Sequence, residues 1–229
     1  MQEGLKDMKV NKNKEFFNLN EKQKNSLKKS NKVFLDLRPK FMIAILNEMV
    51  PKNVKSALDI GSGCRISKAQ YIKHSFKKYI GLDTENADIN QDLNINQKID
   101  LPNNSVEIVI VSNILEHLIN PMPIVSECKR IAKKYILIGL PNEYPLDKRI
   151  QILFGNWEDW VYLYGHKHMF SIESIERLIQ QNFGGYERKK LCFQCRGGRF
   201  IPKKIKNFLV QKFPGLFAGE VFYLIKKHN

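Results

Sequence analysis

A glycine-rich turn is the first feature of this sequence that could do chemistry. Asp59 is followed by Gly61 and Gly63, and the turn joins an apolar run, residues 56–60, to a segment that can be a helix, residues 66–74. Glycines at such a turn let ligand atoms approach the backbone. The following helix N-terminus would present free N–H groups. The turn alone predicts a nucleotide-type ligand.

An acidic residue, Asp83, ends the next apolar run, residues 79–82. A carboxylate at this position can accept two hydrogen bonds from a ribose diol. The turn and the acid together predict a nucleoside-containing cofactor, which could be NAD or S-adenosylmethionine.

Three histidines are candidates for a general base, because histidine titrates near neutral pH: His117, His166 and His168. The C-x-x-C pair of Cys192 and Cys195 could join His166 and His168 in a zinc site. Structural zinc usually draws on tighter sets of ligands. We therefore predict no metal site and expect both cysteines in or beside a strand.

Alternating strands and helices must position these residues. Continuous rather than alternating apolarity, as in residues 106–112, is typical of strands buried on both faces in a parallel sheet. We expect a doubly wound α/β sheet. The predicted strands are 56–60, 79–82, 106–112, 134–140, 186–193 and 220–226, and the predicted helices are 39–50, 66–74, 121–133 and 171–184.

Length and composition fit a single globular domain. The chain has 229 residues and 43% hydrophobic content, which excludes wholesale disorder. No apolar run approaches the roughly 20 residues that span a bilayer, and the N-terminus is too polar for a secretion signal. We predict a cytoplasmic protein with a flexible basic arm, residues 1–32, and one domain, residues 33–229, with inserts at about 142–170 and 196–219.

The net charge of +15 is unevenly distributed along the chain. Residues 1–55 carry +7, residues 56–185 carry −1 and residues 186–229 carry +9. Basic flanks of this kind suggest a nucleic acid, a phosphorylated substrate or an anionic membrane surface. The alternative is a general bias of the chain toward lysine, asparagine and isoleucine.

The stretch from Leu58 to Pro141 resembles the class I S-adenosylmethionine-dependent methyltransferases, particularly the type 11-like group. Five segments match the motifs of this family in the expected order. They are Asp59-Ile60-Gly61-Ser62-Gly63, Gly81-Leu82-Asp83, the loop that contains Asp92, the Leu101-Pro102 turn, and Asn113-Ile114-Leu115-Glu116-His117.

The resemblance implies a Rossmann-like, doubly wound sheet of seven strands in the order 3-2-1-4-5-7-6, mostly parallel, with the last strand antiparallel. It implies that S-adenosylmethionine is the cofactor and that seven residues bind it. Gly61 and Gly63 would face its methionine part, Asp83 its ribose and Asp92 its adenine, with Asp59, Asn113 and Leu115 completing the set.

Two departures from the family pattern stand out. Arg65 replaces the usual third glycine, which leaves a non-catalytic S-adenosylmethionine-binding protein as an alternative. The short spacing between Asp83 and Asp92 predicts that the usual intervening helix is absent or very short.

The two inserts are the expected acceptor site. The first contains Trp157, Trp160, Tyr162 and Tyr164, and the second contains a basic amphipathic segment, residues 203–213, that could lie on an anionic membrane. These features favour a small-molecule, glycan or lipid-linked acceptor. Methylation of RNA is the alternative that the basic ends suggest, although we find no added RNA-binding module. The sequence leaves the oligomeric state open.

Overall fold

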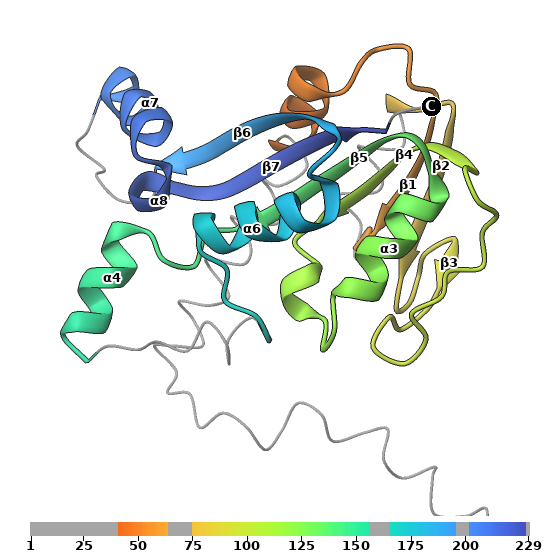
Figure 1. Ribbon diagram of the computed structural model, residues 1–229, viewed down its shortest axis with the longest axis horizontal. Helices are drawn as coiled ribbons and strands as arrows, with labels where there is room; N and C mark the ends of the chain where they lie inside the picture. Colours follow the sequence, from red (N-terminus) through yellow and green to blue (C-terminus); the bar gives the residue numbers. More distant parts are fainter. Residues whose placement is uncertain (1–40, 64–74, 156–164, 196–201, 228–229) are drawn as a thin grey trace, which may run out of the picture.

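The computed structural model describes residues 41–63, 75–155, 165–195 and 202–227, and these form one seven-stranded sheet (Figure 1). The strand order is β3-β2-β1-β4-β5-β7-β6, which confirms the fold class expected from the sequence. The predicted arm, residues 1–32, and the predicted helix 66–74 lie outside the described residues.

Five strands of the sheet run parallel to one another, and the sequence predicted four of them. They are β1 (Ser56–Ile60), β2 (Lys78–Asp83), β3 (Ile89–Asn90), β4 (Val106–Ser112) and β5 (Ala132–Pro141). The short β3 follows β2 with no helix between them, as the spacing of Asp83 and Asp92 predicted. β5 begins earlier than expected, because Ala132 already has an extended backbone where helix α3 (Met122–Ile131) ends.

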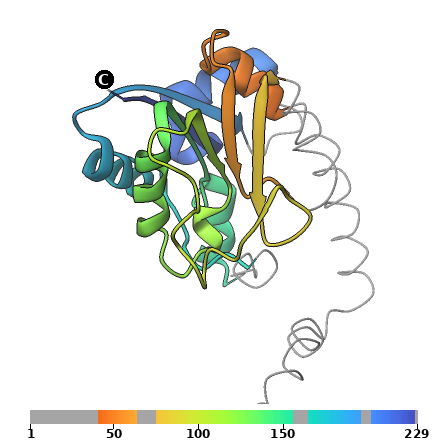
Figure 2. The ribbon, with the colours of Figure 1, turned by 90° about the vertical axis from the view of Figure 1, so that its right-hand side faces the viewer.

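The last two strands pair antiparallel with each other and lie on one side of the sheet, with β6 (Glu187–Cys195) outermost. β7 (Ala218–Lys226) pairs antiparallel with both β5 and β6. This confirms the expected antiparallel last strand and places Cys192 and Cys195 in a strand, as predicted. Figure 2 views the molecule from the opposite end of the sheet, where β1 and β2 lie.

Helices cover both faces of the sheet because successive strand residues point to opposite sides. Leu58 and Ile60 pack with α3 and α6 (Ile172–Phe183) in the larger core, and Ala57 packs with a helix at residues 41–49 in the smaller one. α6 begins at the predicted N-cap, Ser171, whose side chain accepts a hydrogen bond from the Ser174 backbone N–H.

Both inserts lie at the carboxyl ends of the parallel strands, the side of the sheet that we call its carboxyl edge. The first contains α4 (Leu146–Leu153), which follows β5 directly, and the second contains α7 (Lys203–Lys212) and α8 (Pro214–Phe217). α8 contacts both α4 and α7. The pairing of Pro141 with Glu220 fixes the start of β7 beside the end of β5. The second insert therefore lies at the same edge as the first, and the helix predicted at residues 203–213 is confirmed.

Within the parts of the chain that the structure describes, no helix is both long enough and apolar enough to cross a membrane.

A close packing contact in the sheet gives a test of this arrangement. A Cβ atom added at Gly139 of β5 would lie 2.2 Å from the Phe222 ring of β7. We predict that Gly139→Ala lowers the free energy of unfolding by about 1–3 kcal/mol, as overpacking of a core does. Gly185→Ala is the matched control, because a Cβ there meets nothing within 4 Å. Urea unfolding curves measure both variants, and equal stabilities would contradict the β5–β7 packing.

Candidate functional site

The glycine turn is held between β2 and the segment that follows β4. The backbone N–H groups of Gly61 and Ser62 donate to the Leu82 carbonyl oxygen at 2.8 and 3.1 Å. Gly61 has a φ of +70°, and a Cβ atom added there would lie 3.0 Å from the Ile114 side chain. The positive φ favours glycine at this position, and the Ile114 side chain would have to shift to accommodate any Cβ atom there.

Asp83 lies directly against this turn. Its carboxylate accepts a hydrogen bond from the Gly63 N–H at 2.8 Å and another from the Thr84 N–H at 2.7 Å. The structure thus brings Gly61, Gly63 and Asp83 together at the carboxyl ends of β1 and β2, where open α/β sheets bind ligands. Their roles toward a cofactor stay predictions.

Asp59 is the last residue but one of β1, just before the glycine turn, and it is fully buried. The Tyr79 hydroxyl donates to its carboxylate at 2.8 Å. Burial and the neighbouring Asp59 raise the pKa of Tyr79 well above its ordinary value, so the hydroxyl stays protonated and remains a donor. Asp59 therefore has a structural partner in β2, in addition to the cofactor role that the sequence predicts.

Asp92 supports a loop at the same edge. One carboxylate oxygen accepts the Asn94 N–H at 2.8 Å, and the Asp92 carbonyl accepts the N–H groups of Ile95 and Asn96. The carboxylate thus stabilises this turn, and its predicted contact with adenine stays a prediction.

The segment after β4 begins with an unusual backbone conformation. Asn113 has a φ of +54°, and its N–H donates to the Gly139 carbonyl at 3.0 Å. Its side-chain amide lies 3.5 Å from the Glu220 carboxylate. The side chain of Leu115 is buried in the larger core, so any contact of Leu115 with a cofactor would come through its backbone.

Two of the predicted histidines meet at this edge. The rings of His117 and His166 lie edge to face with 4.7 Å between their centroids, although 48 residues separate them in the chain. The Glu116 carbonyl accepts the backbone N–H groups of Lys167 and His168, at 2.7 and 3.1 Å, which ties residues 165–168 to the segment after β4.

Buried carboxylates complete this cluster. Glu116 is fully buried, and one potential ligand atom each from Glu116, His117 and His166 lie within 4.8 Å of one another. Glu143, which is 3% exposed, places a carboxylate oxygen 2.8 Å from Nδ1 of His166. We call these four residues the Glu–His cluster.

The environment of His117 favours its neutral form. Burial, together with the neighbouring His166, lowers the pKa of His117 below its ordinary value. A neutral imidazole carries a lone pair, so its nitrogen can take a proton or bind a cation.

His168 lies outside the Glu–His cluster. Its Nε2 is 3.3 Å from the Ile119 carbonyl, and its ring stacks on Phe170. Cys192 is half-buried in β6, where burial raises the pKa of its thiol. Neither residue belongs to the His- and carboxylate-containing group found among the described residues. Arg65, Trp157, Trp160, Tyr162 and Tyr164 lie outside the described residues.

Sequence reasoning missed two acidic residues of this edge, Glu143 and Glu220. Both are buried, at 3% and 6% exposure, and both lie where β5 ends and β7 begins. A signal for Glu143 was present, because it closely follows a buried strand that ends at Pro141. Glu220 gave no such signal, since it lies within an otherwise apolar strand.

Comparison with known proteins identifies the relatives of this chain. A family model described as a methyltransferase domain matches residues 34–184, which is more than half of the chain. The search of curated proteins found no match.

Solved structures share the fold at low sequence identity. An S-adenosylmethionine-dependent methyltransferase from Archaeoglobus fulgidus is 19% identical with a TM-score of 0.56, and the alignment covers 86% of this chain and 99% of that one. A protein from Thermotoga maritima, described as a possible histamine N-methyltransferase, is 15% identical with a TM-score of 0.57, over 89% and 97% of the two chains. Phosphoethanolamine N-methyltransferase 2 from Haemonchus contortus, solved with S-adenosyl-L-methionine, is 15% identical with a TM-score of 0.53, over 82% of this chain and 52% of that one.

The position of Asp83 gives a test of the cofactor site. Asp83→Asn retains an oxygen that can accept the Gly63 N–H but removes the charge that would bind a ribose diol. We predict that it weakens S-adenosylmethionine binding by about 10- to 150-fold, which corresponds to the 1.5–3 kcal/mol of hydrogen bonds to a charged group. Calorimetry measures the affinity. Glu85→Gln, which removes the same charge from an exposed neighbour, should bind normally, and equal losses in both variants would contradict this assignment.

Proposed function

From the premise that this chain belongs to the family of methyltransferase domains, we propose that its acceptor is a small lipid-linked molecule. The chain has the class I fold, and its cofactor is S-adenosylmethionine. The observation that carries the proposal is the apolar surface of the two inserts. Seven of the ten large hydrophobic side chains exposed among the described residues belong to α4, α7 and the residues that directly follow them.

The donor is proposed to bind over the glycine turn. Its ribose would hydrogen-bond to Asp83, and its methionine part would lie along Gly61 and Gly63. The methyl group would then face the segment after β4, which contributes Glu116 and His117. We therefore place the nucleophilic atom of the acceptor at the Glu–His cluster.

Methyl transfer from a sulfonium is an in-line displacement with a leaving group that is already activated. Alignment of the two reactants can supply about 7–11 kcal/mol of barrier reduction. The Glu–His cluster supports this role because the backbone of Glu116 fixes residues 165–168, so that its side chains come from segments already tied together.

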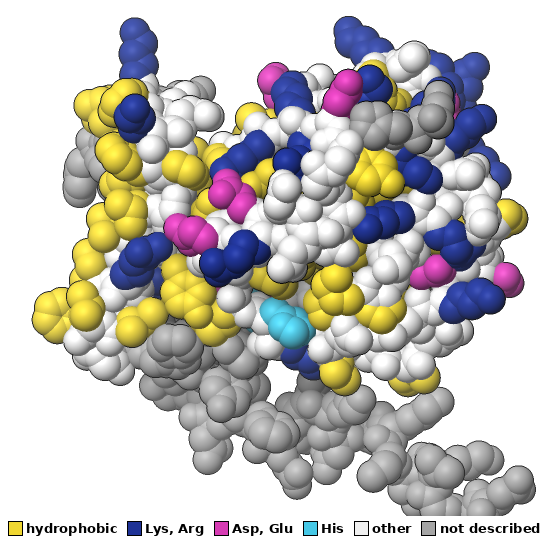
Figure 3. Space-filling model, in the orientation of Figure 1, with side chains coloured by type: hydrophobic (Ala, Val, Ile, Leu, Met, Phe, Trp, Pro, Cys, Tyr) yellow, Lys and Arg dark blue, Asp and Glu magenta, His cyan; other side chains and the backbone are white. Residues whose placement is uncertain are grey.

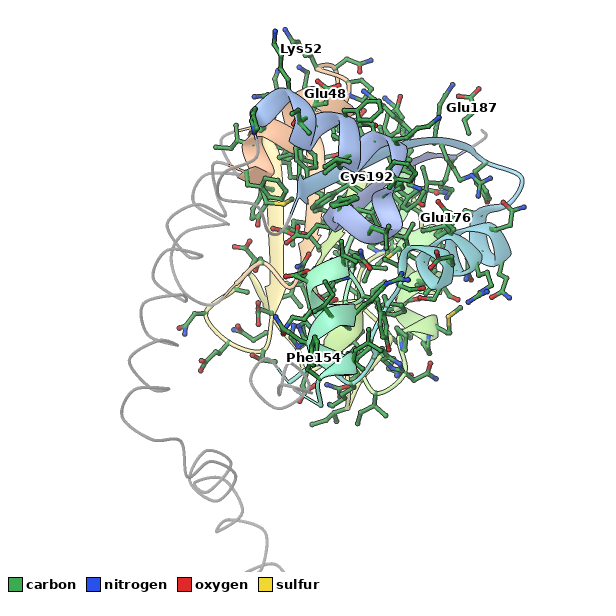
Figure 4. All side chains as sticks on the ribbon, turned by 90° about the vertical axis from the view of Figure 1, so that its left-hand side faces the viewer. Glu48, Lys52, Phe154, Glu176, Glu187 and Cys192 are labelled. Atoms are coloured by element: carbon green, nitrogen blue, oxygen red, sulfur yellow. The ribbon has the colours of Figure 1, made fainter. Side chains whose placement is uncertain are left out.

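The apolar surface extends from this edge outward over the inserts. Leu153 and Phe154 at the end of α4 are 82% and 79% exposed, and Ile205, Phe208 and Phe213 in and after α7 are 50%, 61% and 47% exposed. In Figure 3, hydrophobic side chains extend down the left-hand side of the molecule, from α7 to α4. Figure 4 views the molecule from that left-hand side, with Phe154 labelled near the lower end. We call this surface the insert face.

The charges on the insert face favour an anionic lipid surface as its partner. Arg149 of α4 and Lys204 and Lys212 of α7 are exposed beside the apolar side chains. A helix with apolar and basic residues of this kind binds in the interface of an anionic membrane. A protein bound there could reach an acceptor whose lipid part stays in the bilayer, and the cytoplasmic location expected from the sequence would fit such a surface.

The acceptor class is tested by transfer of a labelled methyl group from S-adenosylmethionine into fractionated cell extract. We predict label in the lipid fraction, and suppression of that label by added S-adenosylhomocysteine. Label found only in bulk RNA would overturn the proposal in favour of RNA methylation. Binding of the donor with no transfer to any fraction would indicate a non-catalytic binding protein.

The insert face is tested separately by vesicle co-sedimentation. We predict that the protein binds vesicles that contain phosphatidylglycerol more strongly than vesicles of phosphatidylcholine, and that Phe154→Asp combined with Phe208→Asp abolishes this binding. S-adenosylmethionine affinity should not change, because both side chains point to solvent. Ile95→Asp is the control, since Ile95 is 85% exposed but belongs to neither insert. Equal loss in the control would show that binding does not depend on the insert face.

A further inference from the structure

We propose that the Glu–His cluster binds a divalent first-row transition-metal ion, with Glu116, His117 and His166 as its ligands. Two imidazoles and one carboxylate form a common ligand set that leaves open positions for other molecules. One potential ligand atom of each residue lies within 4.8 Å of the others, before any ion draws them together.

The orientation of His166 supports ligation through Nε2. Its Nδ1 lies 2.8 Å from the Glu143 carboxylate, and a histidine that binds a metal almost always donates its other ring N–H to a carboxylate or carbonyl group. At this distance Glu143 is the group that would fix the tautomer and the direction of the ring when an ion is bound. Glu143 would therefore position the ligand without touching the ion.

His117 has the same arrangement with a backbone group. Its Nδ1 is 3.4 Å from the Gly165 carbonyl oxygen, which leaves Nε2 for the ion. The two hydrogen bonds from the N–H groups of Lys167 and His168 to the Glu116 carbonyl hold the ligand-bearing segments together. The two imidazoles and the backbone of Glu116 are thus held by contacts that do not involve the ion.

The charges of the cluster also fit a cation. Glu116 is fully buried and Glu143 is 3% exposed. Carboxylates removed from water are normally paired with cationic groups or coordinate metals. A divalent ion bound by Glu116 would place a cation beside these two buried acidic side chains.

The open positions of the ion give it a role in the proposed reaction. A bound cation lowers the pKa of an oxygen ligand, so an acceptor hydroxyl held there would lose its proton to water. The resulting oxygen anion would attack the methyl carbon as the bond from that carbon to sulfur breaks, and S-adenosylhomocysteine would leave. This role rests on the proposed function and adds that the acceptor carries a hydroxyl group, whereas binding of the ion does not depend on that function.

Metal binding is measured by calorimetry with Mn²⁺, Zn²⁺ and Mg²⁺ on the untagged full chain, with neither donor nor acceptor present. We expect one Mn²⁺ or Zn²⁺ ion per chain and weaker binding of Mg²⁺, because imidazole ligands suit transition metals. Glu116→Gln and His166→Asn should each abolish the binding. Glu143→Gln should weaken it by about 10- to 100-fold, the usual effect of losing the partner of a ligand.

His168→Asn is the matched control, because His168 is a near neighbour outside the Glu–His cluster. It should bind the ion as the unchanged protein does. Ion binding that persists in Glu116→Gln and His166→Asn would overturn the proposal, as would the absence of binding in the unchanged protein.

A measurement on the unchanged protein covers the case in which these variants do not fold. Electron spin echo spectra of the Mn²⁺-loaded chain should show coupling to two imidazole nitrogens, and spectra without nitrogen coupling would overturn the proposal. Absence of metal binding with methyl transfer intact would reject only the metal site. Metal binding without any methyl transfer would reject only the proposed function.

Discussion

The register of β1 between β2 and β4 is the constraint on which the rest of this structure depends. Ile60 pairs with Leu82 on one side and with Val111 on the other. All three strands therefore end side by side, and the turn after β1 meets both the acid that ends β2 and the segment that follows β4. A shift of one residue would exchange the two faces of β1, moving Leu58 and Ile60 out of the larger core.

This register also explains why the turn is built from glycine. The consecutive N–H groups of Gly61 and Ser62 both donate to the Leu82 carbonyl, whereas successive N–H groups of a strand point to opposite sides, so the extended strand ends here and the chain turns. Ile114 occupies the space that a Cβ of Gly61 would need. The edge therefore brings backbone groups, rather than bulky side chains, to the place where a cofactor would lie.

The strands and the glycine turn were predictable because their determinants are local. The largely apolar runs of β1 and β4 are typical of strands buried on both faces, and the turn residues follow one another in the chain. The meeting of His117 with His166 was not predictable in this way. It depends on backbone hydrogen bonds from Lys167 and His168 to Glu116, and no local pattern encodes a contact across 48 residues.

Burial is the property that the sequence could not supply for the acidic residues of this edge. Asp92 and Glu143 both follow strands, yet Asp92 stabilises a turn of its own loop whereas Glu143 lies against a histidine from a distant segment. A carboxylate that is buried beside an imidazole costs free energy unless a partner compensates its charge. The fold places these acids at the carboxyl ends of the parallel strands, where the two inserts also begin or end. The apolar inserts and the buried acids lie together because the first insert follows β5 and the second precedes β7, and the start of β7 pairs with the end of β5.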